Sequence, residues 1–124
     1  MVGSSFFVSA DQPNGACWPF STDQLTDTIS RLWPGSALAG GHGSVVEMDI
    51  CVDDRTLTFD WDAAHQVLRF PDQDPLAEPA RIVHRLLREV APDVPVVWWT
   101  ECDATLEPIV LSPDPETFIR EFVG

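Results

Sequence analysis

Four carboxylates alternate with apolar residues along two neighbouring segments of the chain. They are Glu47, Asp49, Asp60 and Asp62. Side chains two residues apart on a β-strand point to the same face, so all four would gather on one face of a sheet. Converging carboxylates can bind a hard cation such as calcium or magnesium, can attract a basic protein by raising its association rate, or can simply face solvent.

Asp62 and His65 add a second kind of chemistry, because a carboxylate that orients an imidazole supports a general base. The pair falls in a predicted turn, where Asp62 could instead accept a hydrogen bond from a backbone N–H. An alternative hypothesis is therefore a small metal- or ligand-binding enzyme that uses Asp49, Asp60, Asp62 and His65. The first segment lacks the glycine of a calcium-binding loop, and the chain has no nucleophile-elbow motif. Our main prediction therefore includes no catalytic residue, no cofactor and no metal site.

The apolar residues between the carboxylates predict the β-hairpin that positions them. With a turn at Asp53-Asp54, a slip of one residue would mix the apolar and acidic faces, so the pattern specifies the register. The opposed apolar pairs are Ile50 with Leu57, Met48 with Phe59, and Val46 with Trp61. On the other face Glu47 opposes Asp60, a like-charge pair that costs roughly 0.2–1 kcal/mol. That cost is either tolerated in solvent or offset by a cation, a basic partner or a neighbouring Arg.

Five tryptophans are many for 124 residues. Trp98 and Trp99 are consecutive in a predicted strand, so they must point to opposite faces. We expect one of them to join Trp61 in the core and the other to lie among the carboxylates. An exposed Trp can anchor an interface and can stack on Arg or Lys. The predicted partner-binding residues are therefore both of these tryptophans and the four carboxylates.

The formal net charge is −13 at pH 7, from 7 basic and 20 acidic side chains. This charge argues against nucleic acid and anionic membranes as partners, because both bind basic surfaces. No apolar run reaches the ~18 residues of a membrane-spanning helix. The charge favours a basic protein or peptide as the partner, or serves solubility alone.

The other segments predict helices and strands around the hairpin. Their order is α-β-β-β-α-β-β-α, which predicts an α+β fold: an antiparallel sheet of about five strands with two to three helices packed on it. The chain is one domain by size, residues 1–124, and 1–20 form an N-terminal arm or edge strand followed by a loop. The expected elements are a helix capped by Ser21 or Thr22 and stopped by Pro34-Gly35, a small-residue loop at 37–43, the hairpin, a strand at 66–70, a helix from Asp74-Pro75 to about Val90, strands at 94–101 and 106–111, and a final helix capped at 112–114.

This order of elements, with the length and the acidity, resembles the type III secretion chaperone-like fold, which also includes the YbjN-like proteins. The resemblance covers about residues 21–124 and involves no sequence motif, so it assigns no functional residue. It implies a protein that holds unfolded segments of a partner and often dimerises. A strand at Phe6-Phe7-Val8 would depart from that layout, and a ferredoxin-like or immunity-protein-like α+β sandwich then stays open.

Two further groups of residues bear on location and assembly. Cys17, Cys51 and Cys102 have no zinc-site spacing, and the N-terminus lacks a secretory signal, so we expect a cytoplasmic protein with free thiols. Cys17 is expected to be buried and inert. Arg81, Arg85 and Arg88 form one basic helix stripe. This stripe would pair with Glu78 and Glu89, or would meet the acidic face of a second copy in a homodimer.

These features together favour a non-enzymatic, acidic protein-binding module. It would be chaperone-like or immunity-like (antitoxin-like), and would dock a basic protein or peptide on its acidic sheet face.

Overall fold

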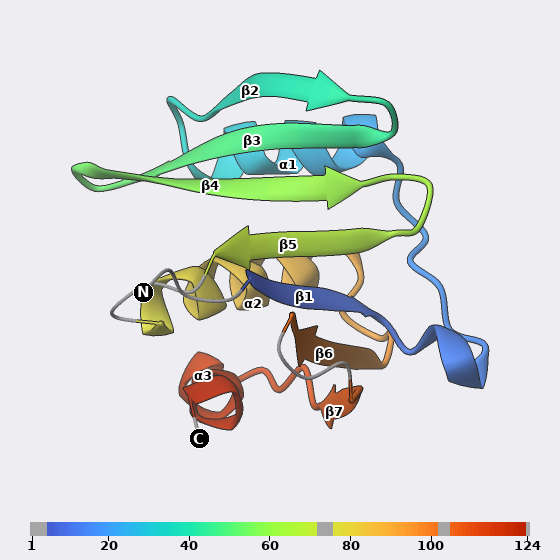
Figure 1. The fold of residues 1–124 in the computed structure, drawn as a ribbon. Helices are drawn as coiled ribbons and strands as arrows, with labels where there is room; N and C mark the ends of the chain where they lie inside the picture. Colours follow the sequence, from blue (N-terminus) through green and yellow to red (C-terminus); the bar gives the residue numbers. More distant parts are fainter. Residues whose placement is uncertain (1–4, 72–75, 102–104, 124) are drawn as a thin grey trace.

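The computed structural model describes residues 5–71, 76–101 and 105–123. In these residues seven strands form one antiparallel sheet in the order β2-β3-β4-β5-β1-β6-β7. Three α-helices lie on one side of the sheet, and no described helix lies on the other side (Figure 1). The predicted α+β class is confirmed, with more strands than the five expected. The strands are β1 (Ser5–Ala10), β2 (Ala37–His42), β3 (Val45–Val52), β4 (Arg55–Asp62), β5 (Val67–Pro71), β6 (Val96–Thr100) and β7 (Glu107–Ile109), and the helices are α1 (Thr22–Leu32), α2 (Ala77–Val90) and α3 (Pro115–Val123).

The hairpin of β3 and β4 has the predicted register. Met48 lies opposite Phe59, and Glu47 lies opposite Asp60. The apolar side chains of this pair enter the core that the sheet forms with the helices; Met48, Ile50, Leu57, Phe59 and Trp61 are each at most 3% exposed. The acidic side chains consequently lie on the side of the sheet opposite the helices, which we call the open face.

Strand β1 corrects the prediction of an N-terminal arm or edge strand. It pairs with β5 on one side and with β6 on the other, so it lies inside the sheet. Phe6 and Val8 face the core, and Phe7 between them faces the open side. A strand that joins two hairpins from later parts of the chain has no local signal for its partners, which is why the sequence did not place it.

Strand β2 corrects the predicted loop at 37–43. It forms the sheet edge beside β3, with a shift of register between Leu38 and Gly40. Gly43, at φ 64°, begins the turn into β3. Glycine followed by serine between two strands is a hairpin signal. The low strand propensity of Ala and Gly concealed that signal.

The helices begin and end close to the predicted points. Ser21 caps α1, because its hydroxyl accepts a hydrogen bond from the Gln24 N–H and the Gln24 side chain accepts one from the Ser21 N–H. Asp114 receives hydrogen bonds at the start of α3. The predicted cap at Asp74-Pro75 lies outside the described residues. Within the described ranges, none of the helices is long and apolar enough to cross a membrane.

Candidate functional site

One row of side chains crosses five strands of the open face. From β3 to β6 it contains, in order, Glu47, Asp60, Arg69, Phe7 and Trp99. Successive members are direct neighbours across antiparallel strands. The sheet therefore brings the predicted acidic residues into one row with an indole from a distant part of the chain.

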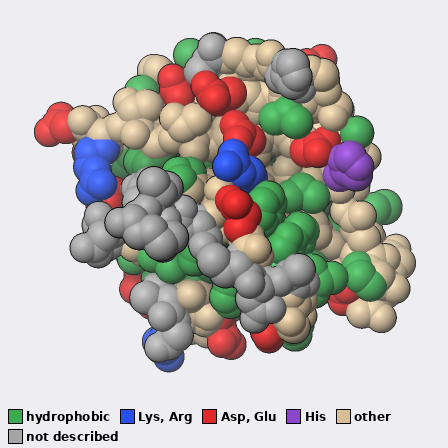
Figure 2. Space-filling view, viewed as in Figure 1, with side chains coloured by type: hydrophobic (Ala, Val, Ile, Leu, Met, Phe, Trp, Pro, Cys, Tyr) green, Lys and Arg blue, Asp and Glu red, His purple; other side chains and the backbone are tan. Residues whose placement is uncertain are grey.

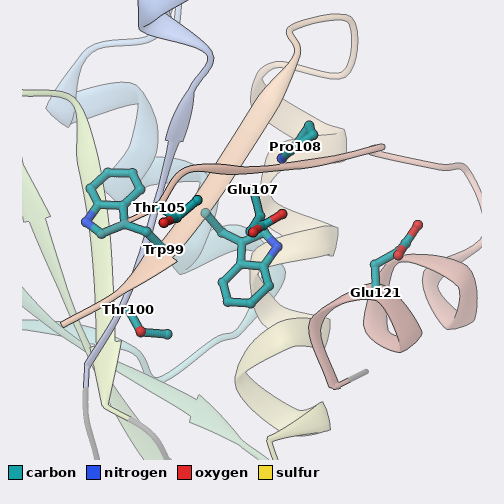
Figure 3. Close-up of a pocket in the computed structure, with 7 residues that line it drawn as sticks. Trp99, Thr100, Thr105, Glu107, Pro108 and Glu121 are labelled. Atoms are coloured by element: carbon teal, nitrogen blue, oxygen red, sulfur yellow. The ribbon is translucent and has the colours of Figure 1, made fainter. Parts of the chain in front are cut away.

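Trp99 is the tryptophan that lies on the open face. Its ring stacks on Phe7, with centroids 5.4 Å apart and planes inclined by 11°. Trp98 points toward the helices, where its ring lies 5.9 Å from Phe6 and 5.1 Å from Phe122. Figure 3 shows Trp99 and Glu107 on opposite sides of β6, and Glu107 is the cross-strand neighbour of Trp98. Trp98 is therefore not part of the open face, although it was among the predicted partner-binding residues.

A groove of about 500 Å³ lies on the open face. Its apolar lining is formed by Phe7, Val45, Val67 and Trp99. Asp60, Asp62, His65 and Arg69 supply its polar groups. Figure 2 shows acidic and hydrophobic side chains mixed over this side of the molecule, with few basic ones.

Arg69 offsets the like-charge pair that the hairpin register creates. Its Nη1 lies 2.6 Å from Oδ2 of Asp60. A neighbouring Arg was one of the expected ways to offset the repulsion between Glu47 and Asp60, and the structure shows such an Arg. Both side chains are partly exposed, so the ion pair is worth only about 0.2–1 kcal/mol. Among the described residues Glu47 has no hydrogen bond or ion pair, so its charge is available at the surface.

Asp62 closes the turn that follows β4. Its Oδ1 accepts hydrogen bonds from the Ser44 hydroxyl at 3.0 Å and from the N–H groups of Ala64 and His65 at 3.1 and 3.3 Å. Its Oδ2 lies 2.8 Å from Nδ1 of His65, whose side chain is 77% exposed. The turn-closing role considered for Asp62 is confirmed, and the same carboxylate also contacts the imidazole.

These contacts give Asp62 a pH-dependent effect on stability. Burial raises the pKa of the Asp62 carboxyl. Hydrogen bonds from His65 and Ser44 together lower it by more than burial raises it, so the pKa of Asp62 lies below its ordinary value. A lowered pKa in the folded state stabilises the protein above the unfolded-state pKa of about 3.9, and this stabilisation disappears as the pH falls through the folded-state pKa.

We therefore expect Asp62→Asn to reduce the acid sensitivity of folding. The free energy of unfolding from urea titrations should fall more steeply for the wild type than for the variant between about pH 5 and pH 3. The difference in the free energy of unfolding between the wild type and the variant should be largest near pH 7. A gap that stays constant over this range would contradict the lowered pKa of Asp62.

The residues of the enzyme hypothesis are not brought together as a metal site. Asp60 is paired with Arg69, Asp62 with His65, and Asp49 accepts a hydrogen bond from the Thr58 hydroxyl at 2.9 Å. In the part of the chain that the structure describes, no group of three His, Cys, Asp or Glu side chains is placed to hold a metal ion.

Two predictions about other residues were wrong. Glu78 and Glu89 do not pair with the arginine stripe, because they bind Arg55 and Arg31. Cys17 is exposed, whereas a buried thiol was expected; it is free, as is Cys51. Cys102 lies outside the described residues.

Sequence reasoning missed Phe7 and Arg69, two members of the row across the open face. Arg69 lies between Leu68 and Phe70 on β5, so alternation alone assigns it to the face opposite the core. That signal was available in the sequence. Phe7 could be placed only once the partners of β1 were known.

No family model, no curated protein and no solved structure matches this chain. The function must therefore be inferred from the residues of the open face.

Proposed function

We propose that this protein binds a basic segment of another protein, in extended conformation, on the open face of its sheet. The observation that carries the proposal is the groove of about 500 Å³, which combines a stacked Phe7–Trp99 pair with an acidic surround. The carboxylates on the described strands of this face are Glu47, Asp49, Asp60 and Asp62, and Arg69 is the one arginine on these strands that faces the same way.

The two components of the groove have different roles in binding. The excess negative charge raises the association rate of a cationic partner and disfavours acidic ones. Affinity comes mainly from burying the Phe7 and Trp99 rings, since buried aromatic side chains are the usual hot spots of interfaces. A face that served solubility alone would gain nothing from an apolar groove.

The row of side chains also suggests the order of residues in the bound segment. From Trp99 to Glu47 there are four strand spacings, about 19 Å. An extended segment of about six residues spans that length. Arg69 lies between the two ends and repels a cation there. The preferred segment therefore carries apolar residues at the Trp99 end and basic residues at the Glu47 end.

Chaperone-like and immunity-like roles differ in what the partner must be. A chaperone-like protein binds an unfolded segment, so a short peptide suffices. An immunity-like protein needs a folded basic domain. The order of elements from β3 onward supports the chaperone-like reading, although β1 and β2 both depart from that layout. A non-enzymatic role and a cytoplasmic location belong to the same proposal, and the free thiols of Cys17 and Cys51 support the location.

Reversing one charge on the open face tests the proposal. The probe is a blocked Phe-Leu-Ser-Ser-Lys-Lys peptide, compared with the same peptide ending in Glu-Glu. We expect Glu47→Lys to weaken binding of the basic peptide about tenfold in calorimetric titrations at low salt. Stability should hold or rise by a few tenths of a kcal/mol, because the variant replaces the like-charge pair with Asp60 by an attractive one.

Asp27→Lys is the matched control. It changes the net charge by the same amount, at an exposed position of α1 on the opposite side of the sheet from the open face. Its effect on binding should be less than about twofold. Equal losses in Glu47→Lys and Asp27→Lys would show that only the net charge matters and would contradict a site on the open face. Asp60→Lys is unsuitable, because it would place a second cation beside Arg69.

The metal- or ligand-binding enzyme remains the second candidate, supported by the contact of Asp62 with His65 at the groove. This candidate predicts that a divalent cation raises the melting temperature and that Asp60→Asn removes the effect. Binding of the basic peptide without any effect of the metal would favour the first proposal.

A further inference from the structure

A second cavity lies on the helix side of the molecule, remote from the open face. It has a volume of about 410 Å³ and is formed where β4 approaches α2 and the end of α1. Small-molecule sites usually have volumes of roughly 300–1,000 Å³ and apolar walls with a few polar groups. Here the apolar part is formed by Trp33, Leu57 and Ile82, and three arginines, Arg55, Arg81 and Arg85, reach the cavity.

The three guanidinium groups differ in what they contact. Arg55 is engaged by Glu78, and Nη1 of Arg81 lies 2.9 Å from Glu116. Arg85 makes no ion pair with any carboxylate of the described residues. Its guanidinium instead lies over the ring of Trp33, 5.6 Å from the centroid. Within the part of the chain that the structure describes, Arg85 is therefore held in place by an aromatic ring and not by a carboxylate, which leaves its guanidinium for an anion.

We propose that this cavity binds a small carboxylate with an apolar body. A guanidinium donates two parallel hydrogen bonds to a carboxylate, which fits the planar fork of Arg85. The apolar body would cover Trp33, Leu57 and Ile82, which are already at least nine-tenths buried and so form a dry floor. A small inorganic anion would satisfy Arg85 but has no apolar atoms to pack against this floor.

The overall charge of −13 does not prevent such binding. Charges farther than about 8 Å from the site are largely screened at physiological salt, whereas Arg85 would touch the ligand. Asp53 and Glu78 also line the cavity and reduce its positive charge. For a minimal ligand we therefore expect a dissociation constant on the order of 1 mM.

Benzoate is the probe, with benzyl alcohol as its neutral counterpart and inorganic phosphate as an anion without an apolar body. Each is titrated to about 20 mM into the nitrogen-labelled full chain, and the indole N–H signal of Trp33 is followed by NMR. Benzoate is expected to shift that signal saturably. Benzyl alcohol and phosphate should each bind at least about tenfold more weakly.

Arg85→Gln is expected to raise the dissociation constant for benzoate at least about tenfold. Arg88→Gln removes a charge from the same helix outside the cavity and should leave it within about twofold. If Arg85→Gln does not retain a native spectrum, Arg85→Lys takes its place, because it keeps the charge but loses the two-pronged contact and should bind several-fold more weakly. The inference is overturned if the Trp33 signal does not respond to benzoate, if Arg85→Gln binds as the wild type does, or if benzyl alcohol or phosphate binds as tightly as benzoate.

Discussion

Replacing Trp99 by alanine is expected to weaken binding of the basic peptide about 30-fold, or by roughly 2 kcal/mol. Trp99 and Phe7 form the stacked aromatic pair of the groove, and truncating the indole removes most of the apolar surface that a ligand would bury. The side chain is only half-buried in the free protein, so the cost in stability should be much smaller than the 3–5 kcal/mol typical of a core Trp. Calorimetric titration and urea unfolding measure the two effects separately.

Trp98→Ala is the matched control, because it removes the same side chain from the adjacent position on the opposite face. Trp98 packs on Phe6 and Phe122, so its loss should lower stability more than the loss of Trp99 does. Binding of the peptide to the folded fraction should be nearly unchanged. If Trp98→Ala weakened binding as much as Trp99→Ala, the assignment of the open face as the binding surface would be wrong. Trp99→Phe should retain most of the affinity, since a ring still stacks on Phe7.

Alternation predicted the parts of this fold whose partners are close in sequence. The register of β3 with β4 followed from the apolar pairs and the turn at Asp53-Asp54, because a slip of one residue would mix the apolar and acidic faces. β1 and β2 were not predicted as they occur. β1 pairs with strands far along the chain, and β2 consists mainly of Ala and Gly, whose side chains give no alternation. In both strands the pairing depends on the neighbouring strands more than on local propensity.

The candidate site, like the fold, was predictable only where its residues lie on strands whose alternation is visible in the sequence. Glu47 and Asp60 were assigned to one face from sequence, together with one of the two consecutive tryptophans, and the structure identifies that tryptophan as Trp99. The groove itself was not predictable, because its floor depends on Phe7, which β1 brings between Arg69 and Trp99. Arg69 also explains how the like-charge pair of Glu47 and Asp60 is accommodated, because its guanidinium contacts Asp60.

Trp61→Ala is expected to have the largest effect on stability, a loss of about 4 kcal/mol. The indole is 1% exposed, and its ring lies 5.8 Å from Trp18 and 5.3 Å from Phe20. Its Nε1–H also donates a hydrogen bond to the Thr22 hydroxyl at 3.0 Å. One side chain thus joins the sheet to the segment that leads into α1, and its loss leaves a cavity where three large rings meet. A domain stable by 5–15 kcal/mol would lose a substantial part of its stability.

Trp61→Phe separates the two roles of this side chain. The smaller ring keeps contacts with Trp18 and Phe20 but leaves the Thr22 hydroxyl without its donor, so we expect a loss of about 1–2 kcal/mol. Urea unfolding of both variants measures the difference. Trp61 also lies between Asp60 and Asp62 on β4, so the cavity in Trp61→Ala should loosen the acidic strand as well and weaken binding of the basic peptide. A Trp61→Ala protein with the wild-type urea midpoint would contradict the placement of this indole in the core, and with it the assignment of the flanking carboxylates to the open face.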